Sequence, residues 1–276
     1  MAEQVAIIGA GGKMGQRAAR KIGRDPHYRV LMCESHPERA AQLAAQGYDV
    51  TGLAEALREA DFAFLAVPDS AIAAVAREAA PLMKAGAMLI MLDAAAAYVG
   101  DLPQVAHIGM MITHPCHPPI FTDYPTPEER QDYFGGVARQ DILVCLVQGT
   151  EEAFTRGVAV CRAVFAPVDR AHRVTVEQFA FLEPAMSELV VAAAARWMRE
   201  ALEAAVEAGV PREAAEAFLA GHAQIALAIC FGAEKSPFSD AALRAIAWGK
   251  RELIAPDWKK VYREDVLKSA IKEMIR

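Results

Sequence analysis

The sequence lacks long apolar runs, paired cysteines and any excess of positive charge. None of its apolar stretches reaches the roughly 18 residues that a membrane-spanning helix needs, so we expect no membrane partner. The formal net charge of −6 provides no general attraction for nucleic acid, and we expect no nucleic-acid partner either. An anionic substrate would therefore depend on arginine or lysine side chains placed locally around its site.

The placement of the cysteines and the start of the chain indicate in which cellular compartment we expect the protein. The five cysteines are scattered, and no two of them form the C-x-x-C pattern of many redox and zinc sites. Most lie in apolar runs, as buried thiols do in a reducing compartment. The N-terminus enters an apolar strand pattern without the basic and apolar leader of a secretory signal. These features together predict a cytoplasmic protein.

The N-terminal stretch is the most informative one. The apolar run Val5–Ile8 leads into a glycine-rich turn, and helix-forming residues follow. A strand, a glycine turn and a helix start in this order point backbone N–H groups and the positive end of a helix at a diphosphate. Gly9 allows the tight turn, Gly11 leaves room for close approach of a cofactor, and Gly15 lets helix and strand pack closely. The residues expected to contact a dinucleotide here are Gly9, Gly11, Gly12, Lys13, Met14 and Gly15.

A second strand supports this interpretation, because the third glycine sits one residue later than in G-x-G-x-x-G and the motif alone is weak. The strand at residues 28–33 is followed by Glu34. A carboxylate at this strand end can accept hydrogen bonds from both ribose hydroxyls and repels a 2′-phosphate, which favours NAD over NADP as the cofactor. The alternative is that Glu34 is only a solvated strand end.

A third apolar strand ends in a proline. Residues 61–67 read as a buried parallel strand, which runs into Pro68 and Asp69. The carboxyl end of such a strand lies on the cofactor side of the sheet. We therefore expect Val67, Pro68 and Asp69 to flank the ribose or the nicotinamide, although an ordinary strand-to-helix turn would equally explain Asp69.

The 276 residues suffice for two domains. Further strands near 48–51, 87–92, 105–113 and 141–148 alternate with helices, so residues 1–172 predict a doubly wound parallel sheet of the Rossmann type. Residues 173–276 contain almost no strand pattern and predict an all-helical domain for substrate binding and dimerisation. Thr175–Gln178 fits a capping box at the start of its first long helix, and Pro184 should interrupt that helix. Because this region is too apolar to stand alone, we expect it to pack on a second copy as a homodimer.

The candidate catalytic residues begin with a proline-rich stretch after the strand at 105–113, where His114 and His117 stand among three prolines. The prolines hold both imidazoles rigidly, at the edge where a nicotinamide ring would lie. A dehydrogenase needs a base of near-neutral pKa, and histidine meets that need without tuning. Two alternatives for these histidines stay open. They could be metal ligands together with Cys116, so a divalent metal is possible although its full ligand set is unknown. They could instead only bind backbone carbonyls.

The helical region adds two candidates. Glu183 stands beside Pro184 in an apolar run, where a buried carboxylate would pair with a cation such as a histidine of the first region. Glu183 and Glu188 could instead form salt bridges elsewhere. His222 lies in an otherwise apolar helical stretch and is either a satisfied core residue or a contact for substrate oxygens.

Taken together, these patterns resemble the 6-phosphogluconate dehydrogenase-like superfamily over nearly the whole chain. Within it, His114-Pro115 is similar to the catalytic His-Pro pair of prephenate dehydrogenases, whose histidine contacts the substrate hydroxyl. The fuller stretch Thr113–Phe121, with Phe181–Pro184 and Gly221-His222, resembles the D-apionate oxidoisomerase group. That resemblance implies NAD-dependent oxidation of a branched sugar acid, a small carboxylate, followed by a rearrangement.

One difference from the superfamily limits which residue could act as the catalytic base. The catalytic lysine that β-hydroxyacid dehydrogenases carry early in their long helix has no counterpart, since Thr175–Val191 contains no lysine. We therefore expect His114 as the base, Glu183 to orient or charge it, and His117 or His222 to hold substrate oxygens. The alternatives within the enzymes are a prephenate dehydrogenase-type and a plain β-hydroxyacid dehydrogenase. An alternative of another class is an NAD(H)-sensing regulator, which would require a basic nucleic-acid-binding face or a partner-binding tail.

Overall fold

The computed structural model describes residues 2–276 and divides them into two compact units. The first unit extends to Glu183 and also includes Lys268–Arg276, and the second comprises Pro184–Leu267. The functional domain boundary expected at residue 173 remains a prediction.

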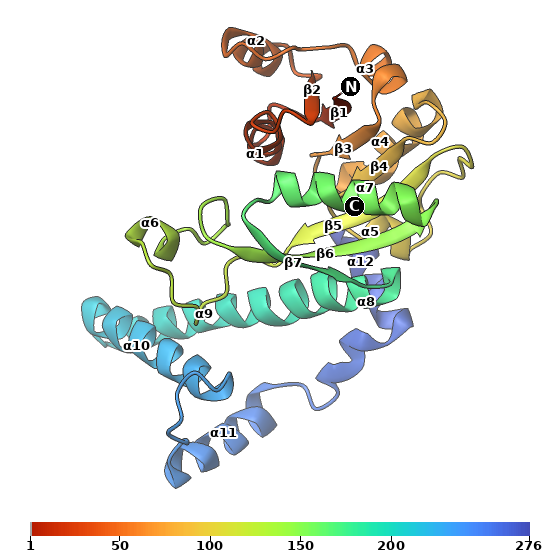
Figure 1. Cartoon of the computed structure of the whole chain (residues 1–276). Helices are drawn as coiled ribbons and strands as arrows, with labels where there is room; N and C mark the ends of the chain where they lie inside the picture. The colour runs from red at the N-terminus through yellow and green to blue at the C-terminus, as the bar shows by residue number, and fades with distance from the viewer. Residues whose placement is uncertain (1) are drawn as a thin grey trace. The chain divides into compact units, whose positions relative to one another are not determined.

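A seven-stranded sheet forms the centre of the first unit, with the strand order β2-β1-β3-β4-β5-β6-β7 (Figure 1). Its strands are β1 (Glu3–Ile8), β2 (Tyr28–Cys33), β3 (Phe62–Leu65), β4 (Met88–Met91), β5 (Gly109–Pro115), β6 (Gln140–Gln148) and β7 (Val168–Arg173). Strands β1 to β5 are mutually parallel, so their carboxyl ends meet at one edge. The predicted Rossmann-type α/β fold is confirmed.

Helices follow the strands in alternation. Those of the first unit are α1 (Lys13–Ile22), α2 (Pro37–Ala45), α3 (Leu53–Glu59), α4 (Asp69–Ala79), η1 (Ala80–Leu82), α5 (Ala95–Tyr98), α6 (Pro127–Arg130), α7 (Glu151–Val164) and α8 (Val176–Ala180). The remaining helices are η2 (Phe181–Ala192), α9 (Ala193–Glu207), α10 (Arg212–Cys230), α11 (Asp240–Leu253), η3 (Trp258–Tyr262) and α12 (Glu264–Met274). Within residues 2–276, no helix has the length and apolar character that crossing a membrane requires.

The sheet is covered on both faces because its strands alternate side chains between two cores. In β1, Ala6 and Ile8 pack with residues of α3, α4 and α8, whereas Val5 and Ile7 pack with residues of α1 and α7. Each large apolar side chain buried in this way contributes about 1.5–3 kcal/mol. Because helices cover both faces of the sheet, the ends of its strands and the loops that follow them remain accessible at its edge.

Three details differ from the sequence-based expectation. The stretch 48–51 forms only a single bridge, from Val50 to Met32, although Tyr48 and Val50 pack against the core. Strand β5 begins later than expected and includes His114, which pairs with Leu143 of β6. Strand β6 runs antiparallel to β5, since their connection carries only the one-turn helix α6 and no crossover helix.

The long helical stretch after residue 175 begins as expected. Thr175 and Gln178 form a capping box at the start of α8, as the sequence predicted. Around Pro184 the interruption takes the form of a π-helix, η2, rather than a kinked α-helix. Proline has no N–H to donate, and the wider π-turn accommodates the missing bond. Such segments often accompany functional sites.

Candidate active site

The glycine turn between β1 and α1 is tightly enclosed. Gly9 has φ +80°, and a Cβ there would lie 2.6 Å from the Ala66 carbonyl oxygen. At Gly15, in the first turn of α1, a Cβ would lie 2.5 Å from the Gly9 carbonyl oxygen. Side chains would therefore push α1 away from the turn. The first turn of α1 carries no acidic residue, so its N–H groups and positive dipole end suit a phosphate.

Glu34 lies against this turn. Its Oε2 accepts a hydrogen bond of 2.8 Å from the Gly11 N–H, and its Oε1 accepts one of 2.9 Å from the His36 N–H. The turn and the carboxylate, predicted separately to bind a dinucleotide, are thus brought together. Gly12, Lys13 and Met14 follow directly at the start of α1.

The end of β3 completes the predicted cofactor set. Val67 and Pro68 connect β3 to α4, and a Cβ on Gly9 would lie 3.0 Å from a methyl carbon of Val67. Asp69 is the first residue of α4, where loss of surrounding water and then repulsion from Asp93 raise its pKa to about 6. Asp93 is itself buried and accepts a hydrogen bond from the Ala95 N–H. All predicted cofactor residues therefore lie at the carboxyl edge of β1, β2 and β3, although their roles remain predictions.

His114, near the end of β5, has a fixed orientation. Its Nδ1 lies 2.9 Å from the Leu92 carbonyl oxygen, and because a carbonyl only accepts, Nδ1 donates in the neutral ring. The lone pair is then on Nε2, which lies 3.9 Å from Oε1 of Glu183. Burial lowers the pKa of His114 from 6.5, against the opposing effects of the Leu92 bond and Asp93. The imidazole is therefore neutral at neutral pH, as a base must be.

His117 lies close to His114, with ring centroids 6.0 Å apart and the rings edge to face. Its φ is +60°, a left-handed conformation that few non-glycine residues adopt. Its Nδ1 lies 3.2 Å from the Phe134 carbonyl oxygen. The structure thus brings together three of the four predicted catalytic residues, His114, His117 and Glu183.

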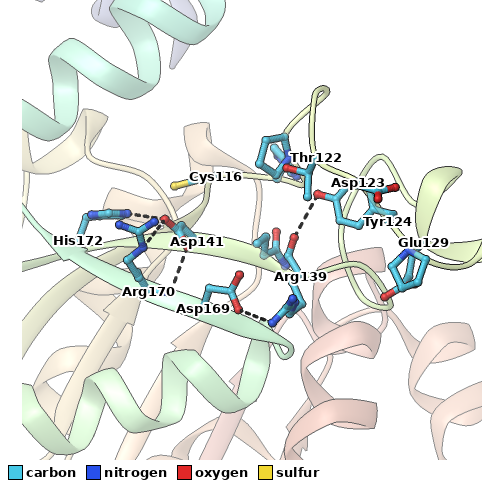
Figure 2. Close-up of a pocket in the computed structure, with 14 residues that line it drawn as sticks. Cys116, Thr122, Asp123, Tyr124, Glu129, Arg139, Asp141, Asp169, Arg170 and His172 are labelled. Carbon is cyan, nitrogen blue, oxygen red and sulfur yellow. Dashed lines mark hydrogen bonds and ion pairs between the residues drawn. The ribbon is translucent and has the colours of Figure 1, made fainter. Parts of the chain in front are cut away.

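A cavity of about 620 Å³ adjoins His117 (Figure 2). It is bounded by the β5–β6 connection and by the amino ends of β6 and β7, and its charged side chains are largely paired. His172 donates to Asp141 over 2.6 Å, and Arg139 lies 3.5 Å from Asp169. Cys116 also lines the cavity, where burial and then Asp141 raise its pKa to about 11, so the thiol is protonated.

Sequence reasoning identified Cys116 and His117 but not the charged residues of this cavity or the two carbonyls that orient the histidines. Arg139 and Asp141 lie about 30 positions before Arg170 and His172, and the four carry no motif. Their proximity results from the parallel pairing of β6 with β7. The available signal was the high content of charged residues in β7, the strand at one edge of the sheet.

The fourth predicted catalytic residue, His222, belongs to the second unit. It lies on α10, where Nδ1 is 2.9 Å from the Phe218 carbonyl oxygen and the ring stacks on that of Phe218 at 3.8 Å. Its expected contact with substrate remains a prediction. Among residues 2–276, no group of three or more histidine, cysteine, aspartate or glutamate side chains is arranged to hold a metal ion.

Comparison with known proteins agrees with this geometry. Residues 122–275 match the family described as phosphogluconate dehydrogenase (decarboxylating), C-terminal, and residues 4–96 match NADP oxidoreductase, coenzyme F420-dependent. A D-apionate oxidoisomerase of Cupriavidus necator is 43% identical over 272 residues, which cover 98% of each chain. One of Pectobacterium atrosepticum is 40% identical over 274 residues, covering 99% of this chain and 95% of the relative.

A solved structure extends the likeness to three dimensions. It is described as a semialdehyde dehydrogenase NAD-binding protein from Cupriavidus necator in complex with calcium and NAD. The TM-score is 0.94 at 42% sequence identity, and the match covers 99% of this chain and 100% of the other.

Fold, site and matches define the class as phosphogluconate dehydrogenase-like oxidoreductases, which confirms the predicted resemblance and the prediction of an enzyme. Within that class, the chain belongs to the D-apionate oxidoisomerase family.

Proposed function

We propose that this chain oxidises D-apionate, or a closely similar branched sugar acid, with NAD and then rearranges the oxidised product. Two relatives that share 43% and 40% of its sequence carry the name of this activity. The observation that carries the chemical proposal is the anchored His114, whose Nε2 is free of the Leu92 bond and faces Glu183.

The glycine turn fits NAD. Gly9 and Gly15 stand where any Cβ would clash, and the first turn of α1, which carries no acidic residue, would receive the pyrophosphate. Glu34, beside this turn, would accept hydrogen bonds from the ribose hydroxyls. Val67 and Pro68 would line the next part of the cofactor. When bound, NAD supplies the acceptor for the hydride that leaves the substrate carbon.

His114 takes the proton in this proposal. As the substrate C–OH becomes C=O, the hydroxyl proton passes to Nε2, while Nδ1–H keeps its bond to Leu92. The positive charge that forms on the ring is stabilised by the carboxylate of Glu183, 3.9 Å away. His117, 6.0 Å from His114 between ring centroids, would hold another substrate oxygen and polarise the new carbonyl for the rearrangement.

The test is NADH formation with D-apionate by His114→Gln and, as a matched control, His107→Gln. Both histidines bind a backbone carbonyl, His107 that of Met83, and glutamine can still donate there but takes no proton. His114→Gln should lower kcat by about 10²–10⁴ with NAD affinity unchanged, and His107→Gln should remain near wild type. Near-normal turnover by His114→Gln would remove His114 from the role of base.

The product and the cofactor distinguish the alternatives. A rearrangement keeps every carbon of the substrate, whereas a decarboxylating β-hydroxyacid or prephenate-type dehydrogenase releases carbon dioxide, so product mass separates them. Binding of NAD without reduction by any sugar acid or hydroxy acid would instead favour a regulator. Running the same assay with and without EDTA tests the possible divalent metal.

We also propose that the protein is a homodimer formed through the second unit. Large apolar side chains are exposed on its helices, among them Phe218, Trp248 and Leu253. Monomeric proteins seldom expose large contiguous apolar patches.

A further inference from the structure

A row of cations runs along α1 and the turn that follows it, beginning at Lys13, which is also a predicted cofactor residue. Together with a short loop before β6 they line a cavity of about 620 Å³. Its charged lining residues are Lys13, Arg17, Arg20, Lys21 and Arg24. Of the described residues that line this cavity, none has a carboxylate. Like charges three or four residues apart destabilise a helix, and here they recur in a chain whose net charge is −6.

Arg17 is the centre of this row. Its Nη1 donates to the Phe134 carbonyl oxygen over 2.9 Å, and its guanidinium lies 5.6 Å from the Phe165 ring centroid. Its Nε and Nη2 are buried and have no hydrogen-bond partner among the residues that the structure describes. Unsatisfied buried donors are unfavourable by about 1–3 kcal/mol each. Both nitrogens lie below the protein surface, so the guanidinium must shift toward the cavity before acceptor oxygens of a ligand satisfy them.

Lys21 adds a second fixed cation. Its Nζ donates to the Gly136 carbonyl oxygen over 2.5 Å. Burial lowers the pKa of Lys21, repulsion from Arg17 and Arg24 lowers it further, and attraction from Asp132 opposes these effects. A bound anion would relieve that repulsion. Between them, Arg17 and Lys21 hold the loop 134–137 against α1.

The rim of the cavity is apolar. Phe134 is 74% exposed and Val137 is 57% exposed. A flat ring can stack on an exposed phenylalanine, while several cations in a small volume suit several phosphate charges. The volume is within the range of small-molecule sites. We propose that this cavity, the α1 cation site, binds a phosphate-bearing ligand of nucleotide size, separately from NAD.

The site is linked to His117 through one carbonyl group. The Phe134 oxygen that accepts from Arg17 also accepts from Nδ1 of His117, and the Phe134 and His117 rings lie 5.7 Å apart. A ligand that draws Arg17 toward itself weakens one of the two bonds to this oxygen and shifts the loop that holds His117. Arg17 is thus a positioning residue for His117. This coupling rests on the proposed function, whereas binding at the site does not.

The test is binding of ADP to the full-length protein saturated with NAD, measured by calorimetry, with inorganic pyrophosphate and adenosine as further probes. ADP should bind most tightly, pyrophosphate more weakly, and adenosine not at all. Arg20→Gln and Lys21→Gln should each weaken ADP binding about tenfold, because each removes a charged contact. Arg58→Gln, an exposed arginine on α3, is the matched control and should bind as wild type does.

Several results would overturn the site: no ADP binding in the presence of NAD, equal affinity in both variants and wild type, or binding to long oligonucleotides alone. The coupling is tested separately by kcat and KM for the sugar acid with and without ADP. At an ADP concentration near the wild-type Kd, these should change in wild type and much less in Lys21→Gln. If ADP binds and turnover does not respond, the coupling to His117 is wrong and the site stands. If the sugar acid is not oxidised at all, the proposed function fails while the binding result still decides the site.

Discussion

His114 shows how one backbone contact decides the chemistry of a side chain. The Leu92 carbonyl fixes which nitrogen carries the proton, and burial then sets how strongly the other nitrogen holds a second one. A free histidine is half protonated near pH 6.5, whereas the lowered pKa of His114 keeps its imidazole neutral to more acidic pH.

We therefore expect kcat/KM to rise with pH around a midpoint below 6.5. The folded pKa of His114 is lowered, so the neutral base persists to more acidic pH, and activity is lost only as pH falls through the lowered value. Measurement of kcat/KM from about pH 5 to 8 checks this. In Asp93→Asn the midpoint should move lower still, since Asp93 raises the pKa of His114. A wild-type midpoint above 6.5 would contradict the assignment.

We predict that Glu34 sets the choice between NAD and NADP in the same local way. Its carboxylate is held by the Gly11 N–H at 2.8 Å, where it would repel a 2′-phosphate. Replacing it with serine should weaken NAD binding and reduce the preference for NAD over NADP by about tenfold, equivalent to about 1.4 kcal/mol. The ratio of kcat/KM for the two cofactors is the measurement. Glu38→Ser, on the exposed surface of α2, should leave the ratio unchanged, and an unchanged ratio in Glu34→Ser would exclude Glu34 from selection.

At the scale of elements, the β1-turn-α1 unit depends on the absence of side chains at close contacts. Gly15 and Gly221 are both helical glycines, but only Gly15 faces backbone atoms within van der Waals reach. Gly15→Ala should therefore reduce the free energy of unfolding by about 1–3 kcal/mol through overpacking and weaken NAD binding. Gly221→Ala, with open space around it, should instead raise the free energy of unfolding by about 0.4–1 kcal/mol. Urea denaturation with a parallel NAD titration tests both, and equal effects of the two changes would show that packing at Gly15 is not the cause.

The elements also show where sequence reasoning succeeds. The glycine turn, the strand ends and the capping box at Thr175 are local patterns, so the Rossmann-type sheet and the helix starts could be predicted from them. The reversal of β6 was not predicted, although the connection 116–139 contains only the one-turn helix α6 and therefore no crossover helix. The π-helix at η2 was foreseen only as a break at Pro184, since the sequence does not indicate which backbone pattern absorbs the missing bond.

In the candidate site, too, local patterns could be predicted from the sequence and tertiary contacts could not. The anchored histidine could be placed from its position after an apolar strand, whereas its partners Leu92 and Phe134 act through backbone oxygens that any residue could supply. The paired charges around Asp141 depend on the register of β6 and β7. Contacts of this kind come from tertiary pairing and have no residue signature.

At the scale of the whole molecule, the exposed apolar surface of the second unit is the feature that the single chain leaves unexplained. Helix α11 has no buried residue, and its large apolar side chains are exposed, with Leu243 at 51% and Trp248 at 55%. Burial of such side chains against another copy contributes about 25 cal/mol per Å² of apolar area, and a stable interface of this kind buries well over 1,000 Å².

Trp248→Glu should therefore convert a dimer into a monomer, because a charge placed in an apolar interface must be dehydrated without a partner. Light scattering after size exclusion gives the mass directly, and turnover measured on the same fractions tells whether the monomer retains activity. Tyr133→Glu is the matched control, since Tyr133 is a 77% exposed aromatic residue in the first unit and should leave the mass unchanged. A wild-type protein with the mass of one chain would refute the homodimer, and a Trp248→Glu protein with the mass of two would exclude α11 from its interface.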